Sequence, residues 1–509
     1  MNAPMPVLPQ YKTDLITRQL CATAHMDAEF AREVLEEYTV DRVRSVGLPF
    51  GVNLVALVRH ALVSARRRDE RDRQLLALQG LFVLLVLAAL GALGQGSSGV
   101  AGGLGVAALA VLPVGTVVVY RAEWAVRRAV LDLKDSGTSA QRLAPAADPA
   151  LEQDLKSLRS ANMVVYGLEA EAQNPFVGSG WRITESVWSP FDVSKPAQAP
   201  GGGTLTPVPF TAADLHHHLA KTMPRATGLD DLRARNRLYV RGPNVVSLGT
   251  DALPDPTRRP LASIPSSLVK SGAVHSGAGM ETYLCLWVSG DGGQVLVSMH
   301  LKALLHLPML SWEVAAYVLP PLGPRFKLPA EYATSASRLR WGAVLAAVRL
   351  TWRGVLGAAS RMLRRRARAA ERARTDERVR REILKGYRGH DYGSVNSLRE
   401  RAARWDEMGY TERRDAQKYF KLMVQGVLAC TAEFLESRNI DTADLTHQQQ
   451  QIVSLQTYTF NGAIGQVQAG NQNQLNVNQG GQPLAPPGGG AGAGAPGGPA
   501  GVVAPAGLT

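Results

Sequence analysis

Cysteine and acidic side chains are both scarce in this sequence. Its 509 residues include three cysteines, Cys21, Cys285 and Cys430, which lie far apart and form no motif. Such spacing provides no disulfide framework and fits a reducing cytoplasm. The 43 acidic residues are outnumbered by 56 lysines and arginines, so the net charge is +13. A basic chain favours negatively charged partners, which at a membrane surface are anionic lipids.

Signatures of catalysis are missing as well. The sequence has no Gly-x-Ser-x-Gly and no Cys-x-x-Cys motif. His216, His217 and His218 are consecutive, so they cannot share one helical face as the i,i+4 histidines of zinc sites do, and we expect a solvated or partly packed run. Residues 174–181, NPFVGSGW, lack the lysine of a phosphate-binding loop and favour a turn. We therefore predict a non-enzymatic protein without metal or cofactor. A ligand site or active site in residues 161–330, near Pro175 to Gly180, is the alternative.

Charge is also missing from two long stretches, residues 75–93 and 100–120. Each has the length of about 20 apolar residues that a helix needs to cross a bilayer core. Arginines cluster at the outer flanks, at Arg66, Arg67, Arg68, Arg71 and Arg73 before the first stretch and at Arg121, Arg127 and Arg128 after the second. Because arginine stays on the cytoplasmic side, we predict a plasma-membrane hairpin over residues 75–120 with both termini cytoplasmic. A buried hairpin in a soluble core is the alternative.

The two stretches contain no Asp, Glu, Lys, Arg or His, and Gln79 is the one polar side chain of the first. Ion and proton paths are usually marked by intramembrane ionisable groups, so we do not expect a pump. Glycines and alanines of the second stretch, such as Gly102, Gly103 and Gly105, favour close helix packing within the hairpin or between protomers. An oligomeric pore remains an alternative.

The flanking segments are predicted to be helical. Residues 1–74 form an N-terminal cytoplasmic segment in which Met26, Phe30, Val34 and Tyr38 repeat at helical spacing, and a second helix starts near Asn53. Residues 121–160 form a helical stalk that is divided at residues 136–137 and again near Pro145.

Residues 161–330 alternate short apolar runs with glycine and proline, as expected for strands. NMVVYG, RLYVRG, YLCLWVSG and GQVLVSMHL are the clearest, and residues 289–293, SGDGG, form a hairpin loop between the last two. A further strand alternates over residues 312–318. We predict a cytoplasmic α+β domain with a mostly antiparallel sheet and a poorly structured insertion at residues 196–209.

Helices return after this domain. Residues 339–385 form one basic amphipathic helix, with Arg349 and Arg353 off its apolar face. That face is formed by Trp341, Leu345, Val348, Trp352, Val355, Ala359 and Met362. Tryptophan and arginine in this arrangement are typical of a helix that lies in the membrane interface. One alternative is a helix packed on the sheet domain and continued by a solvated charged helix. The other is a basic nucleic-acid surface, which we do not expect because aromatic residues are not interleaved with the arginines. Residues 386–447 form a C-terminal helical region.

The end of the chain lacks charge altogether, because no Asp, Glu, Lys or Arg follows Asp444. Residues 480–509 are mainly Gly, Ala and Pro and are predicted to be disordered. Residues 448–479 are rich in Asn and Gln with regularly placed glycines, a composition that allows amide ladders in a stacked in-register sheet. The predicted self-assembly residues are Asn461, Gly465, Gln466, Val467, Gln468, Ala469, Gly470 and Asn471. A low-complexity polar linker is the alternative.

The core Val467-Gln468-Ala469-Gly470 resembles short amyloid signalling motifs of the RHIM type and their pseudo-palindromic fungal and bacterial relatives. Those motifs have a β-branched residue, Gln, an apolar residue and Gly; Ala469 departs from them, since a larger aliphatic residue is usual. The resemblance implies a membrane-acting or cell-death effector recruited to a sensor protein that carries a like motif. The strand sequences named above, with VLPPLGP at residues 318–324, resemble uncharacterised actinobacterial two-span membrane proteins.

Together these features predict a membrane α-helical hairpin, a cytoplasmic α+β domain and C-terminal helices with a disordered tail. The function we expect is that of a membrane-anchored, non-enzymatic signalling or effector protein that self-assembles through its C-terminal motif. Its expected partners are plasma-membrane lipids, further copies of itself and a sensor with a like motif, without nucleic acid. A membrane-surface scaffold without assembly and a membrane-anchored ligand-binding protein or enzyme are the alternatives.

Overall fold

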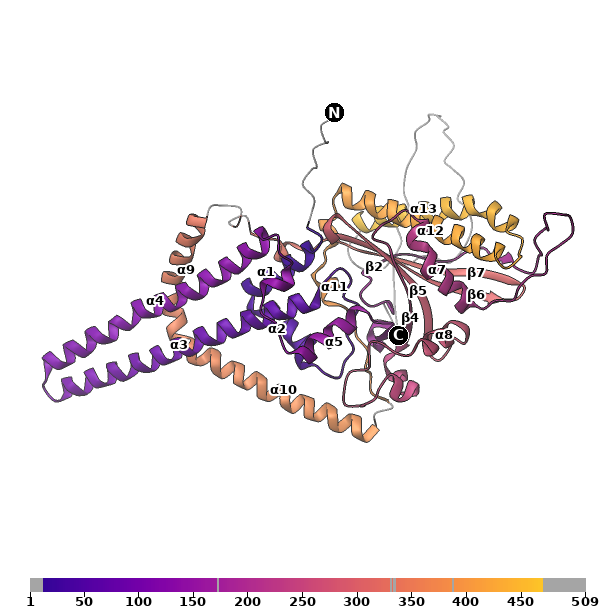
Figure 1. Ribbon diagram of the computed structural model, residues 1–509. Coiled ribbons are helices and arrows are strands. Elements are labelled where there is room, and N and C mark those ends of the chain that lie inside the picture. The colour runs from indigo at the N-terminus through magenta and orange to yellow at the C-terminus, as the bar shows by residue number, and fades with distance from the viewer. Residues whose placement is uncertain (1–11, 172–173, 330–331, 333–335, 387–388, 470–509) are drawn as a thin grey trace, which may run out of the picture. The chain divides into compact units, whose positions relative to one another are not determined.

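Two long helices, α3 (Leu54–Gly94) and α4 (Ser98–Asp135), lie side by side as a hairpin (Figure 1). They belong to a computed structural model that describes residues 12–171, 174–329, 332, 336–386 and 389–469. Asn53 caps α3 by accepting a hydrogen bond from the Ala56 N–H at 3.2 Å. Both helices are long and apolar enough to cross a membrane. Only 6% of the most apolar 18-residue segment of α3 is buried by the rest of the protein. The two predicted spans are therefore helical. The turn between them and the helix start near Asn53 lie where the sequence predicts them.

The base of the hairpin is surrounded by short helices from both sides of it in sequence. These are α1 (Leu15–Met26), α2 (Ala28–Leu35), the π-helical turn η1 (Glu36–Val40), η2 (Ala140–Leu143) and α5 (Pro149–Arg159). Their apolar side chains share one core with the first turns of α3 and the end of α4. Arg59 of α3 pairs with Glu152 of α5 at 2.7 Å, with both side chains largely buried. The predicted stalk is divided where expected, because α4 ends at Asp135 and α5 begins after Pro145.

A seven-stranded mixed sheet forms the second part of the fold. Its strands are β1 (Met163–Tyr166), β2 (Trp181–Val187), β3 (Phe191–Asp192), β4 (Arg233–Arg241), β5 (Met280–Gly290), β6 (Val295–His306) and β7 (Met309–Leu319). The order is β1-β4-β5-β6-β7-β2, with β3 beside β7. Only the β1–β4 pairing is parallel among the described strands. The antiparallel prediction is confirmed, whereas β2 and β3 were not predicted.

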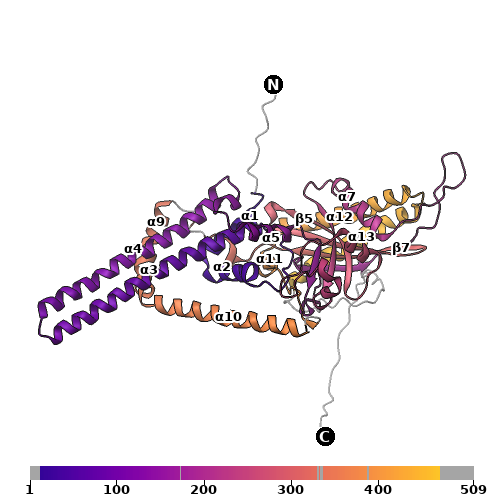
Figure 2. The same cartoon turned by 60° about the horizontal axis from the view of Figure 1, so that its bottom comes forward.

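Side chains alternate between the two faces of this sheet. One face packs against α7 (Ala212–Ala226), α12 (Tyr410–Glu436) and α13 (Ala443–Ala469), which lie together in both views (Figures 1 and 2). The other face holds a cluster of aromatic side chains under residues 48–50 and 176–177. Smaller elements complete the fold: α6 (Leu168–Glu171), η3 (Gly242–Asp251), α8 (Ser266–Val274), η4 (Asp291–Gly293), η5 (Pro324–Phe326), α11 (Leu398–Ala402) and η8 (Trp405–Glu407).

Two local predictions need correction. Residues 196–209 are not poorly structured: Ala197 N–H donates to Asn439 O and Val208 N–H donates to Arg438 O, because the end of α12 offers unpaired carbonyls. The histidine run lies in α7, and His216 is fully buried rather than solvated or partly packed. Its Nε2 accepts the Ala303 N–H at 3.0 Å, and burial lowers the pKa of His216 to about 4. A neutral ring is therefore part of the core at neutral pH.

Candidate functional site

The helix that carries the predicted membrane-interface residues packs on the hairpin. This helix, α9 (Ala336–Leu356), buries Leu339, Ala343, Ala347, Thr351 and Val355. Gly115 of α4 permits the approach, since a Cβ there would lie 3.1 Å from the Val355 side chain. The main packing partners of α9 are α4 and then α3.

The opposite stripe of α9 is apolar and exposed. The exposed fractions are 69% for Trp341, 57% for Leu345, 62% for Val348, 54% for Trp352 and 46% for Leu356. These residues recur every three or four positions and therefore line one side of the helix. Arg349 and Arg353 are exposed beside them. We call this set the tryptophan stripe; it is apolar surface with no cover among the residues that the structure describes.

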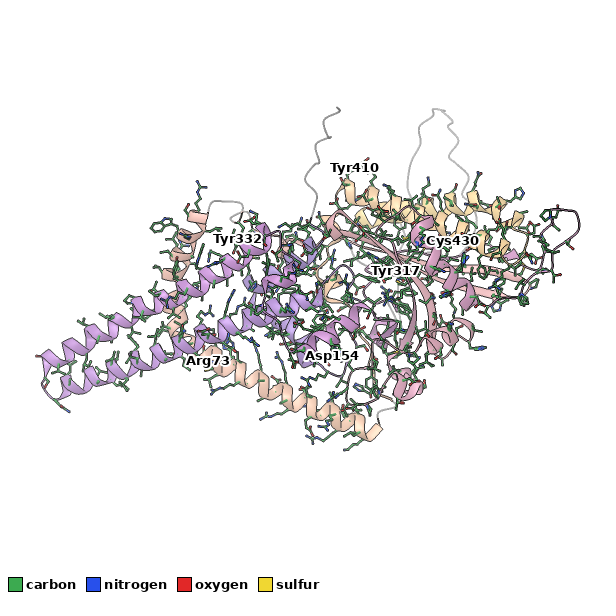
Figure 3. The ribbon with its side chains drawn as sticks, in the orientation of Figure 1. Arg73, Asp154, Tyr317, Tyr332, Tyr410 and Cys430 are labelled. Carbon is green, nitrogen blue, oxygen red and sulfur yellow. The ribbon has the colours of Figure 1, made fainter. Side chains whose placement is uncertain are left out.

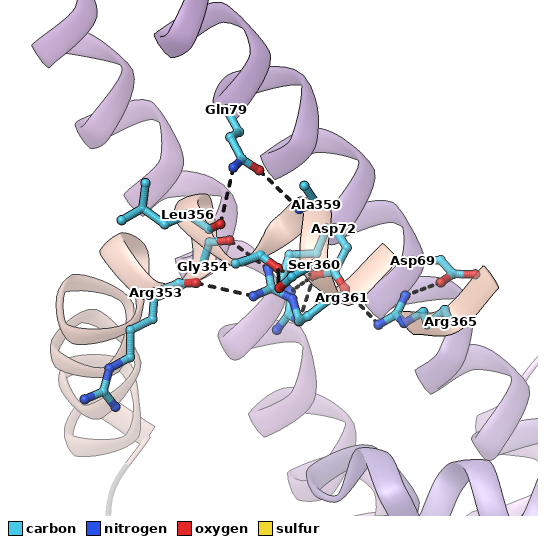
Figure 4. A network of polar contacts seen from close by, with 12 residues as sticks. Asp69, Asp72, Gln79, Arg353, Gly354, Leu356, Ala359, Ser360, Arg361 and Arg365 are labelled. Atoms are coloured by element: carbon cyan, nitrogen blue, oxygen red, sulfur yellow. Dashed lines mark hydrogen bonds and ion pairs between the residues drawn. The ribbon is translucent and has the colours of Figure 1, made fainter. Parts of the chain in front are cut away.

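The predicted single helix over residues 339–385 is in fact two helices. α9 ends at Leu356 and α10 (Ala358–Gly386) begins after Gly357, where the chain turns (Figure 4). Val355 is therefore buried against the hairpin, and Ala359 and Met362 belong to α10 instead of the tryptophan stripe. Figure 1 shows α9 crossing the hairpin at a steep angle and α10 leaving it on the other side.

Side chains satisfy the backbone groups that this break exposes. The Gln79 amide donates to Leu356 O at 3.3 Å and accepts the Ala359 N–H at 3.1 Å (Figure 4). The Arg361 guanidinium donates to Gly354 O at 2.7 Å and to Arg353 O at 3.3 Å. An inserted side chain of this kind is a known cause of a sharp helix break. Gln79, the lone polar residue of the first apolar stretch, thus has a structural role.

A buried carboxylate fixes the start of α10 to α3. Asp72 is 1% exposed, and guanidinium groups surround it at 3.0 Å from Arg71, 3.4 Å from Arg361 and 2.8 Å from Arg365. Arg365 also pairs with the exposed Asp69. We call Asp72 and its three arginines the Asp72 cluster. A buried carboxylate is stable only when such partners compensate for lost hydration.

The Asp72 cluster and α9 lie where α3 changes from charged to apolar. Arg73, labelled in Figure 3, is the last charged residue of α3, and the apolar stretch follows at Leu75. Leu75 and Val119 pack with Val355 and Ala358 in one small core. α9 therefore crosses the hairpin at the level where a membrane-spanning helix would leave the hydrocarbon.

The loop of residues 174–180, the alternative ligand site, already has its amides occupied. Glu400 Oε1 accepts the N–H groups of Gly178 and Gly180, each at 2.8 Å. Burial raises the pKa of this carboxyl, while the hydrogen bonds from the backbone oppose that rise. Both glycines have positive φ, and a Cβ at Gly178 would lie 2.5 Å from Leu48 O. The loop borders a small cleft of about 250 Å³, yet its donors bind the chain's own carboxylate.

Beneath that loop lies a serine–histidine pair. Ser179 Oγ is 2.9 Å from His300 Nε2, and Tyr239 Oη is 3.1 Å from His300 Nδ1. Both Ser179 and His300 are 0% exposed, and burial lowers the pKa of His300 well below its usual value. The histidine is oriented by a phenol rather than a carboxylate. The arrangement reads as a satisfied polar network in the core, where hydrogen bonding offsets the cost of burial.

The predicted self-assembly residues lie at the C-terminal end of α13 and beyond it. Ile452, Gln456 and Phe460 are buried, and the Phe460 ring stacks on Phe420 with centroids 4.1 Å apart. Asn461, Gly465, Gln466, Val467, Gln468 and Ala469 continue the helical backbone of α13, whereas Gly470 and Asn471 lie outside the described residues. In the monomer, residues 461–469 are helical, whereas the assembled form is predicted to have strands there. Assembly itself stays a prediction.

A family model described as an AbeC-like domain matches residues 187–474, which is more than half of the chain. The match runs from the end of β2 through the sheet and includes α9, α10, α12 and α13. No curated protein and no solved structure matches the chain. The sequence, including the helix that carries the tryptophan stripe, belongs to the AbeC-like domain family.

Proposed function

We propose that this protein is a membrane-anchored scaffold that holds an AbeC-like domain at the cytoplasmic face of the plasma membrane. In this proposal α3 and α4 cross the bilayer and α9 lies in the interface. The single observation that carries it is the tryptophan stripe, which is exposed at the level where the hairpin changes from charged to apolar. Tryptophan favours that level of a bilayer, since its ring is apolar and its N–H is polar.

The charges agree with this placement. Arg349 and Arg353 flank the tryptophan stripe, and ten further arginines follow Gly357 in α10. Arginine near an anionic leaflet gains about 1 kcal/mol per residue. Lipid would also cover the exposed leucines and valines of the hairpin, whose contact with water is unfavourable.

The anchoring proposal predicts a defined topology. A cysteine introduced by Ser97→Cys, between the two helices, should react with an impermeant maleimide added to intact cells, because the turn lies outside. A cysteine introduced by Thr375→Cys, exposed on α10, should react only after the membrane is opened. The three native cysteines are buried and give a low background. Equal labelling of both sites in intact cells would contradict the proposed topology.

We further propose that residues 448–479 assemble copies of the protein, which would make the scaffold a signalling or effector protein. The support is an uncharged segment rich in amides with regularly placed glycines. A second copy or a sensor with a like motif would supply the matching strand.

Replacing Gln468 by Lys should abolish this assembly, because like charges would stack about 4.8 Å apart along a fibre. A peptide of residues 448–479 is expected to form fibres after a lag and to respond to seeds, as followed by thioflavin fluorescence and fibre diffraction. The control Ala493→Lys, made in a peptide of residues 448–509, should assemble like the unmodified sequence. A native peptide that stays monomeric with seeds present would leave the scaffold without self-assembly.

A further inference from the structure

A large cleft lies between the N-terminal helices and the sheet. Its volume is about 690 Å³, and its walls come from the start of α1, residues 48–53, the end of α5, β4 and β5. Pockets for small molecules usually have 300 to 1,000 Å³. The residues that line it are far apart in sequence and contain no recognisable motif, so the sequence alone gives no sign of the cleft.

The charged lining of this cleft is mainly positive. Arg233, Arg235 and Arg237 alternate along β4 and therefore share one face of the sheet. Lys156 and Arg159 at the end of α5 line the cleft with them. We call these five residues the cationic cleft. None of the five forms an ion pair with a carboxylate in the described ranges of the chain.

The cleft has two acidic residues, and one of them is already occupied. Asp14 pairs with Arg18 at 2.5 Å and accepts the Ala140 N–H at 2.9 Å. Asp231 lies exposed at the start of β4. The five basic side chains repel one another, and Asp231 is the one carboxylate of the cleft lining that is left to offset them. A bound anion would remove that repulsion.

Arg237 is the strongest sign that the cleft is built for a ligand. It is 2% exposed, and its contacts are neutral: Nε donates to Ala161 O at 3.1 Å and one terminal nitrogen lies 2.9 Å from Cys285 Sγ. Its guanidinium lies 4.5 Å from the Trp287 ring and 5.3 Å from the Phe50 ring. Stacking on aromatic rings holds the guanidinium plane in place. A buried cation without a counter-charge is costly unless an anion completes it.

The second wall combines backbone and aromatic groups. The Arg235 side chain donates to Ser160 O, which ties β4 to the end of α5. Burial lowers the pKa of Arg235, and the positive charge of Arg237 lowers it further. Trp287 is half-buried and lines the cleft beside Phe50, with ring centroids 5.4 Å apart. An aromatic surface next to paired arginines suits a ligand with a ring and phosphate groups.

We propose that the cationic cleft binds an organic anion that carries at least two phosphate groups and a planar ring, the chemistry of a nucleoside diphosphate or triphosphate. Arg237, Arg235, Arg233 and Arg159 supply the positive charge for the phosphates, and Trp287 contacts the ring. Bidentate hydrogen bonds to phosphate are the contacts for which the planar guanidinium is best suited. This proposal is independent of membrane anchoring and of tail assembly.

The test uses the full chain in phosphatidylcholine nanodiscs, with ATP and inorganic pyrophosphate as probes in titration calorimetry. Arg159→Gln with Arg233→Gln removes two exposed charges of the cleft and should weaken ATP binding at least tenfold. The matched control, Lys221→Gln with Arg225→Gln, removes two exposed charges of α7 outside the cleft and should leave the affinity within twofold. ATP should bind more tightly than pyrophosphate, and Trp287→Leu should remove that difference.

Three results would overturn the proposal: no ATP binding to the native chain, equal losses in the cleft and control variants, or equal affinity for ATP and pyrophosphate. Nanodiscs with phosphatidylglycerol distinguish the source of the phosphate. If they leave ATP affinity unchanged, the ligand is soluble, as proposed. If phosphatidylglycerol competes with ATP for the native chain and not for the cleft variant, the cleft binds lipid headgroups. That result would refute the proposed ring contact with Trp287.

Discussion

A chain that carries Asp72→Asn should unfold at a clearly lower temperature and lose the contact between α10 and α3. Asp72 is 1% exposed and is the shared partner of Arg71, Arg361 and Arg365. The amide keeps the shape and removes the charge, so three guanidinium groups remain together without compensation. Breaking a buried ion pair costs about 3–5 kcal/mol, and we expect about 2–4 kcal/mol because the arginines are partly exposed.

Asp69→Asn is the matched control for this variant. The same chemical change is made one turn earlier on α3, where Asp69 is half exposed and contacts Arg365 alone. An exposed ion pair contributes at most about 1 kcal/mol. Thermal unfolding in detergent and hydrogen exchange over α10 give the two readouts. Equal small losses in both variants, with α10 still protected, would show that Asp72 does not hold α10 in place.

The tryptophan stripe is expected to lie in lipid. A cysteine at position 345, made by Leu345→Cys, can carry an environment-sensitive fluorophore. In nanodiscs its emission should be shifted to the blue, and lipids brominated near the headgroup should quench it. Trp341→Glu with Trp352→Glu should return the emission to that of water, since burial of two tryptophans contributes on the order of 3 kcal/mol.

Arg349→Cys provides the comparison site for the same fluorophore. It lies one turn further along α9, at the edge of the stripe and next to the exposed Arg353. Its emission should be less shifted, and charged quenchers in the solvent should reach it. If the labels at positions 345 and 349 respond alike to solvent quenchers, α9 lies outside the lipid and another copy or partner covers the stripe.

The hairpin and the main strands could be predicted from the sequence because their patterns are local. Uncharged apolar stretches of about 20 residues indicate long helices, and β4 to β7 contain apolar runs. Strand β2 was missed because Arg182, Glu185 and Ser186 interrupt its apolar residues at the sheet edge. Helix α7 was missed because its three histidines and Pro224 obscure the helical pattern, and its buried face is determined by the sheet beneath it.

Features that depend on distant contacts could not be predicted. The break at Gly357 interrupts an apolar pattern that continues across it, and the cause of the break, Gln79, is 278 positions away. The sequence shows Gln79 as the single amide in an uncharged stretch, but it does not show that Leu356 and Ala359 are its hydrogen-bond partners. The cationic cleft was hidden for the same reason, since Arg159 and Arg233 meet only after the sheet has formed.

The distance along the chain between Gln79 and α9 has a consequence for how the protein is made. α4 ends at Asp135 and α9 begins at Ala336, so about 200 residues are synthesised between them. At about 5–20 residues per second this takes about 10–40 s. During that delay an inserted hairpin holds an amide with no partner, a group that promotes association with any helix that offers polar atoms. If the hairpin inserts as proposed, the nascent protein is most vulnerable to mispairing with neighbouring membrane helices before α9 emerges.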